Sequence, residues 1–417
     1  MKAAAVRAEL DRRAPGQWEL YTKHAESREL VARAAHRGQA LRREEGWAAR
    51  WRQGGALRFA SGSSPALLSD AIVAASSIPV VPTAPLDWPA GVSEIRASPP
   101  AAEPPPDLFE ELSRLVSVES RGDALLRELT LRRGESVERI TNARGLDVCL
   151  SRARYDGVAN AVGRRGTRSC EARIVFQWDE AADLPAVARR LADRAILPLS
   201  EKATPVSRGE WLLDPSVAAA LLARVAPLFC GQTPPRWLHR GQLFSSGVWI
   251  VDDAAADAPV DDEGTPTRRV VVVDGGAWRS ELRDLVAASR AGAASTGHGV
   301  RPSYRTPPAP GPRRLFFETT RDAAPREMLA SVRRGLFASA LTAPLRVDFP
   351  EDRFEAEFTG VALVSGRALG PVAGARASGR LSELLRRIGG IGSDRQFFPM
   401  PYPTGAPTLL IERASFD

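Results

Sequence analysis

Hydrophobic and polar residues alternate with the period of β-strands near the start of the chain. The strand-like stretches are 18–21, 39–42, 45–51 and 56–60. Gly54-Gly55 supplies a hairpin turn between the last two stretches. The pattern then changes to a helical period from Ser64-Pro65 onward. The residues on one face of this expected helix are Leu67, Leu68, Ala71, Ile72 and Ala75.

A similar order of strands and a helix follows after residue 107. The expected strands are 124–131, 138–142, 146–150 and 170–178, and the expected helix is 184–197. Between the two regions, residues 79–106 contain nine prolines, which remove backbone donors and favour an extended linker. We therefore predict an α+β protein with a two-part α/β N-terminal region built on antiparallel sheet, divided into domains 1–78 and 107–200.

Short strands and Gly/Pro turns dominate the chain from about residue 205. The expected strands are 248–251, 269–274, 315–318, 356–364 and 408–412. The expected helices are 215–229, 279–290 and 380–388. This pattern predicts a β-rich, barrel-like C-terminal domain over 205–417.

Composition adds the expectation of an ordinary cytoplasmic protein. The net charge is +7, but the arginines are interleaved with acidic residues, whereas nucleic-acid binding needs a clustered basic face with aromatics. Nucleic acid is therefore not the expected partner. The sequence holds neither an apolar run long enough for a membrane span nor the pattern of a signal peptide at its start. The three cysteines are too far apart for a metal knuckle, and we expect inert thiols.

Two groups of polar residues are candidates for chemistry. Asp252-Asp253 and Asp261-Asp262-Glu263 form either a cation site or a charged loop, in which Gly264 permits the turn. His239 follows a proline-rich stretch and is expected in a loop. His298 lies between glycines, where it either contacts a ligand or partner or belongs to a solvated loop.

Several segments carry a family resemblance in their order and approximate spacing. They are 44–50, 261–269, 295–301, 328–336 and 366–394. Together they resemble signature segments of the TldD/TldE (PmbA) metallopeptidase family. The resemblance covers most of 205–417 and implies a two-part α/β N-terminal region followed by a β-rich C-terminal domain. It also implies that a zinc-bearing TldD-type subunit hydrolyses small unfolded peptides, and that a TldE-type subunit pairs with it around a cleft for an extended chain.

The resemblance also locates the helix that would carry the family's HExxxH zinc motif. In this chain the two histidine positions hold Ala223 and Leu228, and the position of the carboxylate base holds Arg224. None of these side chains can ligate zinc or accept a proton, and no cysteine follows Cys230 to supply a third ligand. We therefore expect no catalytic residue, no metal and no cofactor in this chain, with zinc only in the partner.

The resemblance further implies a substrate-binding role for five residues. They are Asp262, Glu263, Gly264, Thr265 and His298. The expected protein is thus a non-catalytic, TldE/PmbA-like subunit of a heterodimer. Two alternatives stay open: a homodimeric peptide-binding or regulatory protein without a peptidase partner, and a metallopeptidase with an unrecognised site.

Overall fold

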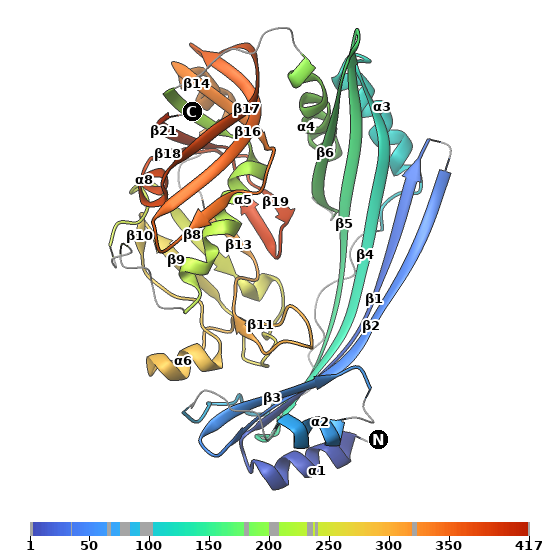
Figure 1. Ribbon diagram of the computed structural model, residues 1–417, viewed down its shortest axis with the longest axis vertical. Helices are drawn as coiled ribbons and strands as arrows, with labels where there is room; N and C mark the ends of the chain where they lie inside the picture. The colour runs from blue at the N-terminus through green and yellow to red at the C-terminus, as the bar shows by residue number, and fades with distance from the viewer. Residues whose placement is uncertain are drawn as a thin grey trace.

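The structure is a computed structural model that describes most of the chain. The described residues are 3–34, 36–64, 68–75, 84–91, 103–178, 183–199, 208–231, 237, 241–318 and 323–415. His239, Leu67 and most of the expected 79–106 linker lie outside them. A long curved sheet stands beside a β-rich C-terminal body in Figure 1.

The long sheet is antiparallel throughout and has the order β3-β2-β1-β4-β5-β6. Its strands are β1 (Trp18–Arg33), β2 (His36–Gln53), β3 (Ala56–Gly62), β4 (Ala124–Asn142), β5 (Asp147–Arg165) and β6 (Arg168–Trp178). Strand β1 pairs with β4 from Glu19 opposite Asn142 to Ala32 opposite Leu129. The predicted antiparallel sheet is confirmed, and it continues across the expected boundaries at 78 and 107.

The strands are longer than their hydrophobic pattern predicts. Residues 124–131 and 138–142 belong to one strand, β4, and residues 39–42 and 45–51 belong to one strand, β2. The middle of β4 is polar and mostly half-buried, so it carries no hydrophobic alternation. Its backbone is nevertheless paired on both sides, with β1 and with β5, because ladder hydrogen bonds do not depend on side-chain burial.

Helices cover the two ends of the long sheet and leave its middle bare (Figure 1). Helices α1 (Ala3–Arg13) and α2 (Leu68–Ala75) pack at one end, over a core that includes Trp18 and Trp51. Helices α3 (Leu108–Glu119) and α4 (Leu184–Ile196) pack at the other end, over a core that includes Leu112 and Leu191. Our sequence analysis missed α1 and α3. Helix α3 has the 3.6-residue spacing of a half-buried helix, through Leu108, Leu112 and Val116.

The C-terminal body consists of two curled sheets and a small two-stranded one. One sheet has the order β15-β16-β14-β7-β21-β18, with β17 paired to β16, and the other has the order β10-β9-β8-β13-β20-β19. The strands of the first sheet are β7 (Arg208–Leu213), β14 (Arg334–Leu341), β15 (Arg346–Asp348), β16 (Arg353–Val364), β17 (Arg367–Arg380), β18 (Ile388–Ile391) and β21 (Leu409–Ser415). Those of the second are β8 (Trp249–Asp253), β9 (Arg269–Asp274), β10 (Ala277–Trp278), β13 (Leu315–Glu318), β19 (Gln396–Pro399) and β20 (Pro403–Ala406). Strands β11 (Gly299–Val300) and β12 (Ala309–Pro310) form the small sheet.

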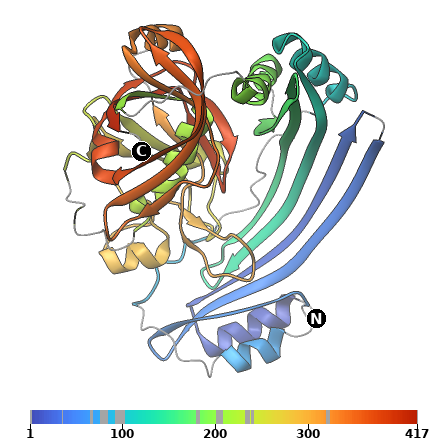
Figure 2. The same cartoon turned by 45° about the horizontal axis from the view of Figure 1, so that its top comes forward.

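Helix α5 (Pro215–Val225) occupies the centre of this body. It contacts strands of both large sheets, which curl around it in Figure 2. Its buried residues join Trp211 and Phe229 in the largest core cluster of the described chain. The predicted β-rich, barrel-like domain is thereby confirmed.

The other C-terminal helices are short. They are α6 (Leu285–Ala291), α7 (Pro325–Ser331) and α8 (Leu381–Arg386). The expected helix 215–229 passes into a 3-10 turn at Ala226–Phe229, where Pro227 cannot continue an α-helix. The expected helix 279–290 begins only at Leu285, because the Asp284 side chain caps it by accepting from Ala287 N. Among the described residues, no helix has both the length and the apolar character to cross a bilayer.

Candidate functional site

The acidic segment 261–265 is a tight turn held by one carboxylate. Asp261 Oδ1 accepts hydrogen bonds from Glu263 N at 3.0 Å and Thr265 N at 2.8 Å. Its Oδ2 accepts from Gly299 N at 2.8 Å, which ties the turn to β11. Gly264 has φ +78, and a Cβ there would lie 2.2 Å from Leu146 Cδ2 in the turn between β4 and β5. The turn therefore needs glycine both for its backbone and for its close approach to the sheet.

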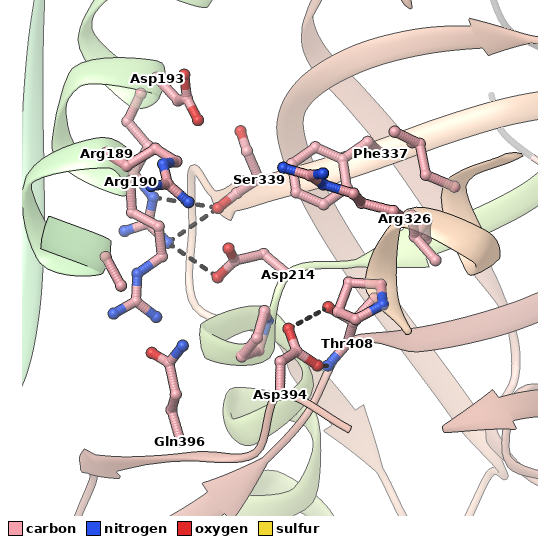
Figure 3. A pocket seen from close by; sticks show the side chains of 16 residues that line it. Arg189, Arg190, Asp193, Asp214, Arg326, Phe337, Ser339, Asp394, Gln396 and Thr408 are labelled. Carbon is pink, nitrogen blue, oxygen red and sulfur yellow. Dashed lines mark hydrogen bonds and ion pairs between the residues drawn. The ribbon is translucent and has the colours of Figure 1, made fainter. Parts of the chain in front are cut away.

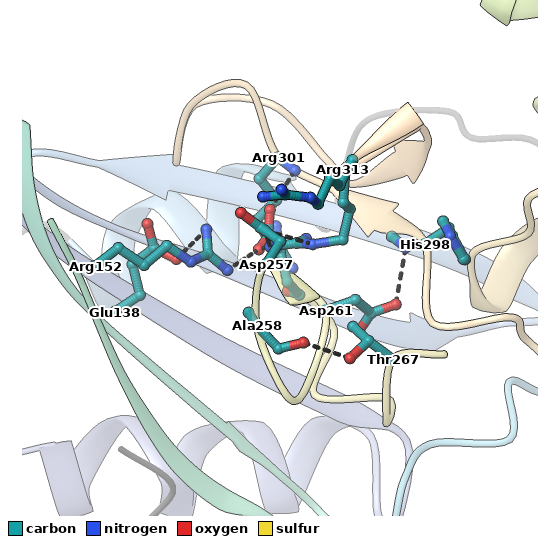
Figure 4. Close-up of polar contacts among 12 residues, drawn as sticks. Glu138, Arg152, Asp257, Ala258, Asp261, Thr267, His298, Arg301 and Arg313 are labelled. Atoms are coloured by element: carbon teal, nitrogen blue, oxygen red, sulfur yellow. Dashed lines mark hydrogen bonds and ion pairs between the residues drawn. The ribbon is translucent and has the colours of Figure 1, made fainter. Parts of the chain in front are cut away.

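The other two carboxylates of the turn form ion pairs that join the C-terminal body to the long sheet. Figure 4 shows Arg152, Arg301 and Arg313 beside the turn. Asp262 Oδ1 lies 3.0 Å from Arg152 Nη2 of β5 and 3.1 Å from Arg313 Nη1. Glu263 Oε1 lies 2.7 Å from Arg50 Nη1 of β2. We call Glu19, Arg50, Arg152, Asp262, Glu263, Arg301 and Arg313 the clamp.

Arg50 binds two carboxylates of the clamp. It is 1% exposed, and its Nη2 lies 2.5 Å from Glu19 Oε2 of β1 while its Nη1 binds Glu263. Its guanidinium also stacks over Trp88, 5.0 Å from the ring centroid. Arg301 reaches the same Glu19 from the C-terminal body. Glu19 thus binds one arginine from each part of the molecule.

The pKa values of Asp262 and Glu263 are shifted in opposite directions by burial and by the neighbouring arginines. Burial would raise the pKa of Asp262, but Arg313 and Arg152 outweigh it and hold that pKa well below its ordinary value. Burial raises the pKa of Glu263 above its ordinary value, and Arg50 opposes this only in part, since Asp284, Asp261 and Glu19 lie nearby. Asp262 is therefore a permanent anion, whereas Glu263 is the titratable member of the clamp.

The structure also places His298 in the interior of the C-terminal body. It is fully buried, with Nε2 3.1 Å from Asp252 Oδ1 and Nδ1 2.9 Å from the carbonyl oxygen of Thr296. The solvated-loop interpretation of His298 is therefore wrong.

Four of the five expected substrate residues are buried, and Thr265 is half-buried. The turn contacts described above hold the domains together, which favours the charged-loop interpretation of 261–263 over a cation site. A peptide-positioning role for these residues stays a prediction.

The three residues at the positions expected for the family's zinc motif, Ala223, Arg224 and Leu228, differ in burial. Ala223 is half-buried at the end of α5, and its carbonyl accepts a hydrogen bond from Tyr402 Oη at 3.0 Å. Arg224 is exposed, and Leu228 is packed in the core. A methyl group, a guanidinium and an isobutyl group do not fit a zinc ion. The described part of the chain holds no cluster of three or more His, Cys, Asp or Glu side chains arranged for a metal.

Cys230 follows this helix and is buried. Burial and the charge of Asp252 raise the pKa of its thiol to about 12, and its Sγ lies 3.3 Å from the carbonyl oxygen of Ala226. Cys230 is therefore a neutral thiol at physiological pH, in keeping with the inert role expected for it.

A cavity that our sequence analysis missed lies between α4 and the C-terminal body (Figure 3). Its volume is about 320 Å³. Helix α4 contributes Arg189, Arg190 and Arg194, and α7 contributes Arg326 from the opposite wall. The spacing of the α4 arginines was a usable signal, since Arg190 and Arg194 are four residues apart and share one helix face.

Comparison with known proteins places the chain in a family. The profile of the PmbA/TldA metallopeptidase C-terminal domain matches residues 211–417. The chain belongs to the TldD/TldE (PmbA) family. The match covers the C-terminal half of the chain.

Relatives of the TldD/TldE family align with part of this chain. An uncharacterised protein of Methanocaldococcus jannaschii is 26% identical over 52% of this chain and 53% of its own length. A Haemophilus influenzae protein named a TldD metalloprotease homologue is 26% identical over 41% of this chain and 39% of its own length. The chain thus spans about half or less of the length of these curated relatives.

Two solved structures share the TldD/TldE fold over nearly the whole chain. TldE from Thermococcus kodakarensis superposes with a TM-score of 0.85 at 18% identity, covering 99% of each chain. A protein from Thermotoga maritima, described as a proposed modulator of a DNA gyrase, superposes with a TM-score of 0.80 at 18% identity, covering 100% of each chain. The long sheet and the C-terminal body are therefore features of a known fold.

Proposed function

We propose that this chain is the non-catalytic, TldE-like subunit of a zinc metallopeptidase complex that processes small unfolded peptides. Its partner in this proposal is a TldD-type chain that carries the zinc ion, and together they enclose the cleft for an extended peptide. The chain itself contributes peptide-binding surface and no reacting group.

The side chains at the zinc-helix positions are the observation that carries the proposal. Leu228 is 6% exposed and packs in the largest core cluster, where a second histidine of HExxxH would have to face a metal. Arg224 cannot act as the carboxylate base, because a guanidinium stays protonated in proteins. The helix serves as core packing in this chain.

The fold likeness and the strand content also support the proposal. One of the solved structures with this fold is named TldE. Extended peptides can bind a protein by adding a strand to an open sheet edge. Among the described strands, β3 and β6 have only one neighbour each in the long sheet.

The test is a peptide-hydrolysis assay with zinc analysis on three samples. They are this chain alone, a TldD-type chain with HExxxH from the same cell, and the two purified together. We expect zinc in the TldD-type chain, no hydrolysis by this chain alone, and a rise of at least about tenfold when this chain is added to its partner.

Two outcomes of this assay would contradict the proposal. Stoichiometric zinc and peptide turnover in the lone chain would show a metallopeptidase with an unrecognised site. Failure of the two chains to associate, with a stable homodimer of this chain instead, would favour a binding or regulatory protein.

A further inference from the structure

The cavity between α4 and the C-terminal body is lined by Arg190, a half-buried arginine of α4. Arg190 makes no hydrogen bond or ion pair to any described residue, and its Nη1 is enclosed without a hydrogen-bond partner there. Its guanidinium lies over the ring of Phe398, with Cζ 5.3 Å from the ring centroid. A buried donor of this kind is costly unless it binds something, so Arg190 is a candidate ligand contact.

The neighbouring charged groups of the cavity are occupied by the protein itself. Arg194 donates to the carbonyl oxygen of Ser339 at 2.9 Å and to Ser216 Oγ at 2.5 Å. The Asp214 carboxylate accepts from Ser216 N at 2.9 Å and caps α5. These contacts leave neither Arg194 nor Asp214 available to neutralise Arg190.

A second carboxylate near Arg190 is also engaged. Asp394 accepts from Thr408 N at 2.9 Å and from Thr408 Oγ1 at 2.7 Å. Burial lowers the pKa of Arg190, with Asp214, Asp183 and Asp394 opposing it, and an arginine remains charged under any physiological condition. An anion entering the cavity would therefore meet a cation without a direct partner among the described residues.

A second cation faces the first from the opposite wall. Arg326 on α7 lines the cavity, is exposed, and has no hydrogen bond or ion pair to a described residue. In Figure 3 its side chain extends beside Phe337, across the cavity from Arg190. Two guanidiniums on facing walls suit a small oxyanion, because each offers several donors in a fixed plane.

Part of the lining is apolar and gives the cavity a second preference. Leu212, Leu329 and Phe337 line it on the side of the C-terminal body. A volume of about 320 Å³ is at the lower end of ligand pockets and suits a group of one or two amino-acid residues. A bare inorganic anion would leave this apolar wall uncovered.

We propose that this cavity binds the C-terminal residue of a peptide, with the free carboxylate between Arg190 and Arg326 and an apolar side chain against Leu212, Leu329 and Phe337. The same chemistry is offered by a small carboxylic acid that carries an apolar group. This inference extends the proposed function, since it assigns a site to the peptide that the complex would process.

Asp193 on α4 opposes anion binding at the same cavity. Burial raises the pKa of Asp193 to about 6, with Glu119 and Asp214 adding to the rise and Arg189 opposing it. The cavity is also lined by the charged residues Arg190, Arg194, Arg326 and Asp394. Below about pH 6 the neutral Asp193 no longer repels a carboxylate, so binding should strengthen there and Asp193→Asn should remove that pH dependence.

The test measures binding by the purified lone chain through fluorescence anisotropy. The probe is a short peptide ending in leucine with fluorescein at its N-terminus, compared with the same peptide carrying a C-terminal amide. We expect the free-carboxylate peptide to bind at least about tenfold more tightly than the amide, and N-acetylleucine to displace it while inorganic phosphate at equal concentration does not.

Three variants decide whether the cavity is the site. Arg190→Gln and Arg326→Gln should each weaken binding of the free-carboxylate peptide about tenfold or more, and Arg190→Lys should weaken it less. Arg279→Gln, which removes an exposed arginine paired with Asp274 outside the cavity, is the matched control and should leave binding unchanged. Because Arg326 is exposed, its variant tests the site even if Arg190→Gln alters the fold.

Equal binding of the amide, absence of binding, or equal displacement by phosphate would each overturn the inference. So would unchanged binding in Arg326→Gln with a folded Arg190→Gln chain. The experiment contains no partner and reads no hydrolysis, so a failure here leaves the proposed subunit role standing. Conversely, binding by the cavity would stand even if no partner-dependent hydrolysis were found.

Discussion

Arg50 and Arg190 both lie between the N-terminal region and the C-terminal body, yet their surroundings differ. Arg50 belongs to the clamp, where it binds Glu19 and Glu263 and stacks on Trp88. Arg190 faces a cavity and has only a ring contact among the described residues. The partners of the guanidinium therefore separate a structural arginine from the one proposed to bind a ligand.

The largest expected effect comes from removing Arg50. Arg50→Ala leaves the buried Glu263 carboxylate without its arginine partner and removes one of the two arginines that bind Glu19. We therefore expect the free energy of unfolding to fall by about 3–5 kcal/mol in urea denaturation. Arg279→Ala, which breaks an exposed pair, should change it by less than about 1 kcal/mol. A small loss in Arg50→Ala would mean that the clamp does not stabilise the fold.

A second prediction contrasts two positions of the zinc helix. Leu228→Ala removes a packed core side chain, and we expect a loss of about 2–5 kcal/mol in the free energy of unfolding. Arg224→Ala changes an exposed side chain and should change the free energy of unfolding by less than about 0.5 kcal/mol. If Leu228→Ala were harmless, the claim that this position now serves packing would fail.

The pH dependence of stability tests Glu263 within the clamp. Its pKa in the folded chain is raised, so its contribution to stability is fully present below the unfolded pKa and is lost as pH rises through the folded pKa. The free energy of unfolding of the native chain should therefore fall relative to that of Glu263→Gln as the pH rises from about 5 to about 9. The fall should be about 1.4 kcal/mol for each unit by which folding raises the pKa of Glu263.

The control for this pH series is Glu355→Gln, which changes an exposed glutamate paired with Arg346. Chemical denaturation at matched ionic strength provides the measurement. An advantage that instead grew with pH would show that the Arg50 pair lowers the pKa of Glu263, contrary to the expected direction.

A small effect on stability is expected at Arg190. Arg190→Gln removes no hydrogen bond or ion pair to the described residues, so we expect a change of less than about 1 kcal/mol in either direction. Differential scanning calorimetry against Arg50→Ala would measure it. A loss as large as that of Arg50→Ala would place Arg190 among the structural arginines.

The sequence pattern predicted the sheets better than the way the parts join. The strand 170–178 was found because one of its faces is buried, and hydrophobic alternation follows from that. The pairing of β1 with β4 was beyond reach, since no local pattern reports which strand becomes a neighbour. For the same reason, Asp262 and Glu263 were recognised as a motif, but their arginine partners on distant strands were not.

The candidate cavity was also out of reach of the sequence. Arg190 and Arg326 are far apart along the chain, and their shared cavity depends on how α4 packs beside the C-terminal body. The zinc-helix substitutions, in contrast, could be recognised directly, because ligand chemistry depends on the side chain alone. The sequence thus reports the side chain at a single position more readily than the grouping of distant side chains.

The order of strands in the long sheet has a consequence for synthesis on the ribosome. Thr141 of β4 donates to the Leu20 carbonyl of β1, across a sequence separation of 121 residues. An emerging β1–β2 hairpin therefore exposes one unpaired backbone edge until β4 has left the exit tunnel. Slow translation between these strands would lengthen that exposure, and a chaperone that covers strand edges would be needed most during this interval.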